Sequence, residues 1–269
     1  MIVTENALNV LTTLAYRGIG RACVLRNFPV NESMNDVVSR LNQKTKNRHF
    51  VSCDDFESRK KRIRSALSRF GVSADGVVAL GDPRFPLHRG TINDGEKPVV
   101  LFYRGNLDLL ARENKNIAVI GLLTPSRETE ALERRVVAAL VERNATIVSG
   151  LALGCDTIAH SQALLSGGKT VAILPSSLNN ILPKGNRDLA QDIVRGGGLL
   201  VSEYYTEASS KQELNSRYVE RDRLQALFSD CVVLSASYAK NDLGHDCGSR
   251  HAMEYARRYS ILRAAIYDA

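Results

Sequence analysis

The sequence predicts an α/β protein with a doubly wound parallel sheet, preceded by a small all-helical N-terminal domain. Two observations predict this fold class. From residue 76 onward, short apolar runs alternate with longer amphipathic segments, as in parallel strands that helices cover on both faces. Before that point, apolar residues recur at the spacing of one helical face. We therefore expect two domains, residues 1–75 and residues 76–269.

The N-terminal domain is expected to consist of helices. Residues 5–28 form two amphipathic segments separated by a Gly-Ile-Gly turn at residues 18–20, and a further helix is expected at residues 58–70. Helix, turn and helix together resemble a helix-hairpin-helix or a SAM-like module. Two interpretations stay open: the turn presents N–H groups to a DNA phosphate beside Arg17 and Arg21, or the hairpin is a packing unit.

The second domain alternates regularly between strands and helices. Because its strands are apolar throughout, the sheet is expected to be parallel, buried on both faces and Rossmann-like. Ligands of such sheets bind outside the carboxyl ends of the strands. Strands are expected at residues 76–80, 99–103, 117–120, 146–148, 170–174, 199–201 and 231–235, and helices at residues 128–143, 156–166, 186–195, 215–228 and 249–258.

One strand, loop and helix junction carries the strongest local signal. Ser149, Gly150 and Gly154 form a small-residue loop after an apolar strand, and Asp156 is placed to cap the next helix. Such a junction gathers unpaired N–H groups at the positive end of a helix dipole, which favours a bound phosphate. The same glycines also suit a plain strand-to-helix connection, so this loop alone leaves both interpretations open.

Charge is unevenly distributed along the chain. The formal net charge is +7, and residues 1–75 hold 13 Lys and Arg against 7 Asp and Glu. A basic face of this kind attracts nucleic acid, because Lys and Arg that neutralise phosphates release counterions. A run from Arg59 to Arg64 also suits the solvated surface of a helix, which charge alone favours.

Other function classes lack a sequence signal. Five cysteines are spread out with no CxxC pair, so we expect reduced, mostly buried thiols and no metal site. There is no P-loop motif and no plausible pairing of nucleophile and base, so neither catalysis nor a cofactor is expected. The chain shows no signal-peptide pattern and no apolar run of transmembrane length, which predicts a cytoplasmic protein without membrane contact.

The segment SGLALGCDTIAH, residues 149–160, matches the SGxAxGxDxxAH signature of the DNA-processing protein A family, also called DprA or Smf. The chain resembles this family over about residues 77–260. Further matching motifs follow in the family's order: GDPRFP at residues 81–86, LFYRGN at 101–106, LPKGN at 182–186, SE at 202–203, RDR at 221–223 and CGSRHAMEYA at 247–256.

The resemblance implies a set of DNA-binding residues around the carboxyl ends of the strands. Lys184 is the foremost phosphate contact that it implies. Of Arg221 and Arg223, one is expected to reach the ligand while the other pairs with an acid such as Glu203, and a purely structural ion pair is the alternative. His160 is expected to be structural. The complete implied set is Ser149, Gly150, Gly154, Lys184, Asn186, Arg187, Arg221, Arg223, Gly248 and Ser249.

The chain also departs from the family pattern. The family's Gly-Ser-Arg after its first Rossmann strand is replaced by Gly121, Leu122 and Leu123, which removes an arginine implied in DNA binding. Arg127 substitutes only if its loop folds back. Other departures are Leu182 in place of a tyrosine, Asp222 in place of the asparagine in RNR, and Cys247 in place of a serine. The winged-helix segment of many family members is not expected after the α/β domain.

The resemblance implies a non-catalytic single-stranded DNA-binding protein, active as a homodimer in DNA processing. Its expected partners are single-stranded DNA and a RecA-type recombinase, which it loads during recombination or natural transformation. The alternative is a nucleotide-binding sensor or a phosphoribohydrolase-like relative, for which Gly248, Ser249 and Glu254 only partly match a PGGxGTxxE segment. A protein-interaction scaffold is a third hypothesis.

Overall fold

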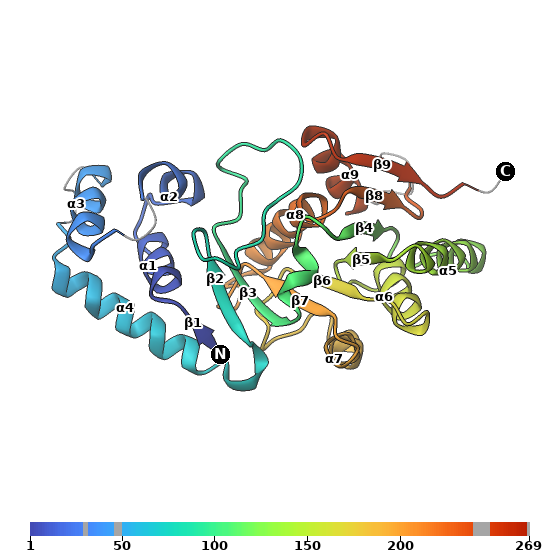
Figure 1. Cartoon of the computed structure of the whole chain (residues 1–269), viewed down its shortest axis with the longest axis horizontal. Coiled ribbons are helices and arrows are strands. Elements are labelled where there is room, and N and C mark those ends of the chain that lie inside the picture. Colours follow the sequence, from blue (N-terminus) through green and yellow to red (C-terminus); the bar gives the residue numbers. More distant parts are fainter. Residues whose placement is uncertain (29–31, 46–49, 239–247, 268–269) are drawn as a thin grey trace. The chain divides into compact units, whose positions relative to one another are not determined.

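The computed structural model describes residues 1–28, 32–45, 50–238 and 248–267. The chain divides into two compact units (Figure 1). The first unit consists of Met1–Phe85 with Ile92–Phe102, and the second of Pro86–Thr91 with Tyr103–Ala269. Residue 75, after which the sequence predicts a boundary, lies inside the first unit. The chain enters the second unit at Pro86, returns to the first at Ile92 and enters the second again at Tyr103.

Helices form much of the N-terminal part of the first unit. They are α1 (Glu5–Leu14), α2 (Arg21–Asn27), α3 (Met34–Lys44) and α4 (Cys53–Ser68). The sequence pattern predicts α1, α2 and α4 but not α3. Helix α4 begins five residues before its predicted start, because Ser52 and Asp55 form a capping box that satisfies the N–H groups of the first turn.

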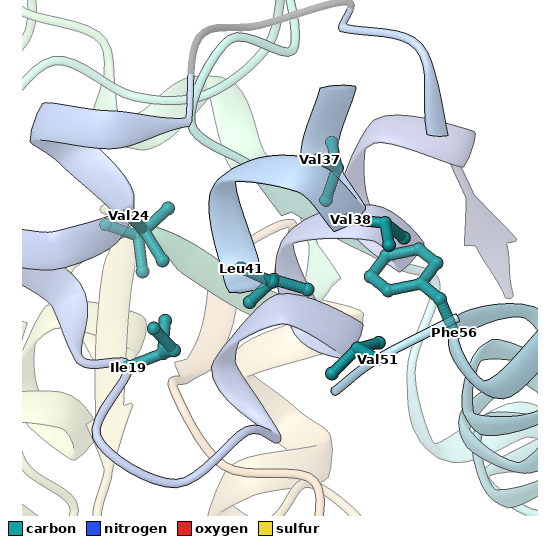
Figure 2. Packing of buried hydrophobic residues seen from close by; sticks show 8 residues of the cluster. Ile19, Val24, Val37, Val38, Leu41, Val51 and Phe56 are labelled. Atoms are coloured by element: carbon teal, nitrogen blue, oxygen red, sulfur yellow. The ribbon is translucent and has the colours of Figure 1, made fainter. Parts of the chain in front are cut away.

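An apolar cluster holds these short helices together. Helices of 7 to 16 residues are marginal by themselves, so their stability comes from the apolar faces that they bury. Helix α3 contributes Val37, Val38 and Leu41 to the cluster, which explains why this segment is helical (Figure 2). The other buried members are Ile19, Val24, Val51, Phe56 and Val99.

The GDPRFP motif fixes the start of α1. In the first unit, β1 (Ile2–Val3) pairs in parallel with β2 (Gly76–Ala79), and β3 (Val100–Gly105) begins there and ends in the second unit. The Asp82 carboxylate accepts hydrogen bonds from the Ala79 N–H and the Thr4 hydroxyl. Thr4 in turn caps α1 by accepting from the Ala7 N–H.

The second unit contains a parallel sheet in the order β7-β6-β5-β4-β8-β9. This arrangement confirms the doubly wound, Rossmann-like fold class. The strands are β4 (Lys115–Ile120), β5 (Ala145–Ser149), β6 (Thr170–Leu174), β7 (Leu199–Ser202), β8 (Cys231–Leu234) and β9 (Leu262–Ala265), and the helices are α5 (Arg127–Glu142), α6 (Cys155–Leu165), α7 (Arg187–Arg195), α8 (Lys211–Leu227) and α9 (Ser249–Arg258).

The order of the strands reverses beside β4. From β4 the chain proceeds outward through β5 and β6 to β7, then returns to place β8 on the other side of β4. Right-handed crossovers put the helices of the two directions on opposite faces. Accordingly, α5, α6 and α7 pack in succession on one face, while α8 packs against α9 on the other (Figure 1). In such sheets ligands bind outside the carboxyl ends of the two strands at the reversal, which here are β4 and β8.

The burial of a strand explains whether it could be predicted from the sequence. Every residue of β5, β6 and β7 is buried, so these strands are apolar runs in the sequence. All four residues of β9 are exposed, and its LRAA sequence carries no such run, so β9 was not predicted. Among the described residues, no helix is long and apolar enough to cross a membrane.

The cysteines differ in burial from the expectation. Cys23, Cys53, Cys155 and Cys231 carry free thiols, but only Cys155 among these four is buried. The other three are partly exposed, which corrects the expectation of mostly buried thiols. Cys247 lies outside the described residues.

Candidate nucleic-acid interface

The loop between β5 and α6 is closed on itself. Gly154 precedes α6 with a positive φ of 72°, and Asp156 is the second residue of the helix. The Asp156 carboxylate accepts hydrogen bonds from the Gly150 N–H at 3.1 Å and the Ala152 N–H at 3.2 Å. Asp156 therefore ties the loop together instead of capping the helix, and it occupies two of the N–H groups that the sequence assigned to a phosphate.

The loop glycines make room for the protein itself. A Cβ on Gly150 would lie 1.1 Å from Nη1 of Arg221, and one on Gly154 would lie 2.3 Å from the Leu122 carbonyl oxygen. Ser149 is fully buried, and its hydroxyl donates to the Val119 carbonyl at 2.7 Å. In this structure Gly150 and Gly154 admit neighbouring protein atoms and Ser149 is held inside the protein, while the implied role of the three residues in DNA binding stays a prediction.

Arg221 belongs to a buried charge cluster beneath this loop. Its guanidinium group lies 3.7 Å from Asp156 and 3.1 Å from Asp222, and Nη1 donates to the Ile173 carbonyl at 3.3 Å. Burial raises the pKa of Asp222 to about 7, against the opposing effect of Arg221. Arg221 is 6% exposed, so its guanidinium group lies inside the protein and not at its surface.

Arg223 forms the structural ion pair that the sequence left as an alternative. Its Nη2 donates to both carboxylate oxygens of Glu203 at 2.7 Å. The Arg223 side chain is 1% exposed and that of Glu203 is 8% exposed. Arg223 is therefore the arginine that makes the expected pair with Glu203, while Arg221 is also buried and pairs with other acids.

Asn186 holds the LPKGN segment against the β5–α6 loop. Its buried Nδ2 lies 2.9 Å from the Leu151 carbonyl oxygen, 3.1 Å from that of Ala152 and 2.8 Å from the Thr157 hydroxyl. Leu151 has a φ of 60°, a conformation rare for leucine that surrounding contacts must maintain. Asn186 thus positions its neighbours, and its amide nitrogen is engaged by these three acceptors.

Lys184 and Arg187 are the exposed cations of this segment. Lys184 begins the short 3₁₀ turn Lys184–Asn186 that follows β6, and Arg187 begins α7. Both side chains are exposed, and within the described part of the chain neither forms an ion pair with a carboxylate. The Asn186 contacts anchor both residues beside the β5–α6 loop, so two unneutralised charges face solvent at the carboxyl edge of the sheet.

Arg217 is a site-forming residue that sequence reasoning missed. It is 6% exposed, and its Nη1 donates to the Thr206 carbonyl at 2.7 Å. Its guanidinium also lies 4.2 Å from the centre of the Tyr204 ring, which is a cation–π contact. Arg217 therefore fixes the loop between β7 and α8. No sequence motif marked it, because its role depends on a loop that folds back onto the helix.

His160 is structural, as the sequence predicted. It is fully buried, and its Nδ1 lies 2.6 Å from the Thr170 hydroxyl. That hydroxyl donates to the Ile147 carbonyl at 2.8 Å, so Nδ1–H of His160 is the donor to Thr170. Burial lowers the pKa of His160 to about 3, which keeps the ring neutral.

The last implied residues lie at the start of α9. Gly248 is exposed and Ser249 is buried at the first position of the helix, while Cys247, which belongs to the same motif, lies outside the described residues. Glu254, the acid required by the phosphoribohydrolase alternative, pairs with Arg257 at 2.6 Å, which lowers its pKa. Among the described residues, no group of three potential ligands is arranged to hold a metal ion.

Fold and site together define a Rossmann-like α/β protein whose exposed carboxyl-edge charges favour an anionic ligand. The chain belongs to the DNA recombination-mediator protein A family, whose model matches residues 76–268. The resemblance to DprA and Smf proteins is thereby confirmed.

Several relatives carry names of this family. DNA processing protein DprA of Streptococcus pneumoniae is 35% identical over 187 residues, which cover 70% of this chain and 62% of that protein. Protein Smf of Synechocystis is 34% identical over 162 residues, 60% of this chain and 39% of the relative. The matched segments thus span less than two thirds of these relatives.

Solved structures agree with the family assignment. The X-ray structure of DprA from Streptococcus pneumoniae matches with a TM-score of 0.71 and 27% identity, covering 100% of this chain and 88% of that one. DNA processing protein A from Helicobacter pylori, whose structure concerns its single-stranded DNA binding mode, matches with a TM-score of 0.57 and 27% identity over 72% of this chain and 81% of that one.

Proposed function

We propose that this protein binds the sugar-phosphate backbone of single-stranded DNA, without catalysis, through Lys184 and Arg187. The observation that carries the proposal is the Asn186 anchor, which holds two exposed, unneutralised cations beside the β5–α6 loop. Membership of the family and the single-stranded DNA binding of the Helicobacter pylori relative support DNA as the ligand.

The expected binding is electrostatic and tolerant of sequence. Lys and Arg that neutralise phosphates release counterions, so affinity falls as salt rises, and phosphate contacts carry no direct sequence information. The backbone N–H groups of the β5–α6 loop contribute less to phosphate binding than the sequence suggested, because the Asp156 carboxylate accepts from two of them. Affinity therefore depends on side-chain cations.

The proposed role is that of a recombination mediator. We infer that the protein holds single-stranded DNA and loads a RecA-type recombinase onto it, as a homodimer, in recombination or natural transformation. The description of the family as DNA recombination-mediator proteins supports this role. Co-sedimentation of recombinase with single-stranded DNA, in the presence and in the absence of this protein, tests the loading step.

The DNA-binding test compares two lysines near opposite ends of β6. Lys184 follows the carboxyl end, whereas Lys169 precedes the amino end and donates to the Gly196 carbonyl. In a fluorescence titration with labelled oligothymidylate, Lys184→Ala is expected to weaken binding and to reduce the salt slope by about 0.7. Lys169→Ala, which removes the same charge, is expected to leave both unchanged.

Two results would contradict this assignment. Equal losses of DNA affinity in the two lysine variants would show that binding depends on the overall charge and not on the position of Lys184. Thermal stabilisation by a mononucleotide, with no binding of the oligonucleotide, would identify a nucleotide-binding sensor instead. If the protein responds to neither ligand, the scaffold hypothesis is favoured.

A further inference from the structure

Two leucines are exposed in the loops after β4 and β5, and one of them stands where the family pattern has lost its arginine. Leu123 follows β4 and is 64% exposed, and Leu153 follows β5 and is 51% exposed. Strands β4 and β5 are parallel neighbours, so both leucines lie at the carboxyl edge of the sheet. We refer to Leu123 and Leu153 as the leucine pair.

Backbone contacts hold the two loops together. The Cys155 N–H donates to the Leu122 carbonyl at 2.9 Å. A Cβ on Gly154 would lie 2.4 Å from the Leu123 carbonyl oxygen, which leaves room only for glycine. Because Leu153 is adjacent to Gly154, the leucine pair occupies neighbouring positions of two interlocked loops and not separate parts of the surface.

The leucine pair also borders the exposed cations. Asn186 contacts the carbonyl oxygen of Ala152, the residue before Leu153, and lies between Lys184 and Arg187 in the sequence. The surface thus runs from Leu123 through Leu153 to the segment that carries both charges. An apolar area beside positive charge suits a ligand that has apolar faces and anionic groups in close succession.

The chemistry of this surface selects an unpaired strand. Isolated exposed leucines are ordinary, but these two leave apolar surface in contact with water. A ligand that covers this surface would gain about 25 cal/mol of binding free energy for each Å² that it buries. In single-stranded DNA the base faces are available beside the phosphates, whereas a duplex hides them in its stack. Single-strand binders commonly combine a basic track with apolar contacts to successive bases.

We propose that the leucine pair forms an apolar contact for the bases of the strand whose phosphates Lys184 and Arg187 bind. This inference rests on the proposed function and assigns a separate task to Leu123, which stands where the family pattern has arginine, and to Leu153. Contact through leucine requires no hydrogen bond to a base edge, so it favours strands that carry bases over bare backbone without selecting a particular base.

The test compares two probes of equal length and charge: a labelled oligothymidylate and an oligomer of abasic tetrahydrofuran units. Wild-type protein is expected to bind the base-bearing probe about tenfold more tightly, since about 1.4 kcal/mol of apolar contact gives that ratio. The Leu123→Ser/Leu153→Ser double variant is expected to bring the ratio close to one, with its abasic affinity unchanged.

Three controls make the outcome decisive. Leu165, 78% exposed at the end of α6, serves as the matched control, and Leu165→Ser is expected to keep the wild-type ratio. Lys184→Ala is expected to lower both affinities by the same factor. The Leu123→Phe/Leu153→Phe variant, which keeps the surface apolar, is expected to retain the preference for bases even if the serine variant folds poorly.

The possible failures are distinguishable. If wild-type protein binds both probes equally, or if the serine variant retains the full ratio, the leucine contact is refuted while DNA binding stands. If wild-type protein binds neither probe, the proposed function fails as well. Selective loss of duplex binding in the serine variant would also refute the inference, because base faces are hidden there.

Discussion

At the scale of single residues, burial decides which charges can reach a ligand. Arg223 is 1% exposed and paired with Glu203, whereas Lys184 is exposed on a short turn. Removing one partner of a buried ion pair leaves an uncompensated charge, so Arg223 contributes to the stability of the fold. The residues that display charge and those that support the site are therefore different, although both lie in family motifs.

Glu133 is a buried carboxyl group that makes stability depend on pH. It is fully buried on α5, and burial raises its pKa to about 7 in spite of nearby Cys155, Ser235 and Arg134. Because this pKa lies above that of the unfolded chain, ionisation favours unfolding. The penalty is absent below about pH 4, grows as the pH rises to about 7, and stays constant above that value.

We expect Glu133→Gln to relieve this penalty. The free energy of unfolding of the variant, relative to wild type, is expected to increase by about 2–3 kcal/mol between about pH 5 and about pH 8. Urea denaturation at both pH values measures it. Asp222, whose pKa burial also raises to about 7, is present in both proteins and cancels in the comparison. A difference that does not vary with pH would contradict the assignment.

At the scale of elements, one amide side chain connects two loops from different strands. Asn186 follows β6, and its contacts lie in the loop after β5. The neighbouring strands bring these loops together, but Asn186 sets how the LPKGN segment lies on its neighbour. The position of the LPKGN segment, and with it the position of Lys184 and Arg187, therefore depends on the buried side chain of Asn186.

We expect Asn186→Ala to weaken DNA binding without removing a phosphate contact. The Leu151 and Ala152 carbonyl groups would lose their donor, so the segment that carries Lys184 would be held less firmly. Affinity for oligothymidylate is expected to fall several-fold while the salt slope stays at the wild-type value, since both cations remain. A slope reduced as in Lys184→Ala would show that Asn186 contributes to phosphate binding directly.

At the scale of the whole molecule, the excess of positive charge lies in the first quarter of the chain. Residues 1–75 hold 13 Lys and Arg against 7 Asp and Glu. Part of this charge is already paired: Lys60 lies 2.6 Å from Glu5, which Arg64 also contacts, and Arg59 stacks on Tyr16. Lys61 and Arg62 on α4 are exposed.

Reversing Lys61 and Arg62 to glutamate lowers the net charge by 4 without touching the candidate site. We expect the association rate with single-stranded DNA to fall at low salt and the dissociation rate to stay unchanged, because long-range attraction affects the encounter. Stopped-flow fluorescence at two salt concentrations measures both rates. A faster dissociation would instead show that α4 contacts the DNA.

The sequence by itself determined the fold class, the family and most elements. Apolar runs revealed β5, β6 and β7 because these strands are buried along their whole length. Two elements were not predicted: α3, although Met34, Val37, Val38 and Leu41 have the spacing of one helical face, and the exposed strand β9, whose four residues form no apolar run. Motif spacing also directed attention to Lys184, which the structure leaves exposed.

Only the tertiary structure decided the role of each motif residue. Sequence order does not say whether an arginine faces solvent or an acid, and both arginines of RDR prove to be buried. It also does not show that Asp156 occupies the loop amides, or that Leu123 and Leu153 lie in interlocked loops. The physical reason is that burial and hydrogen bonding depend on segments distant in the chain, which folding alone brings together.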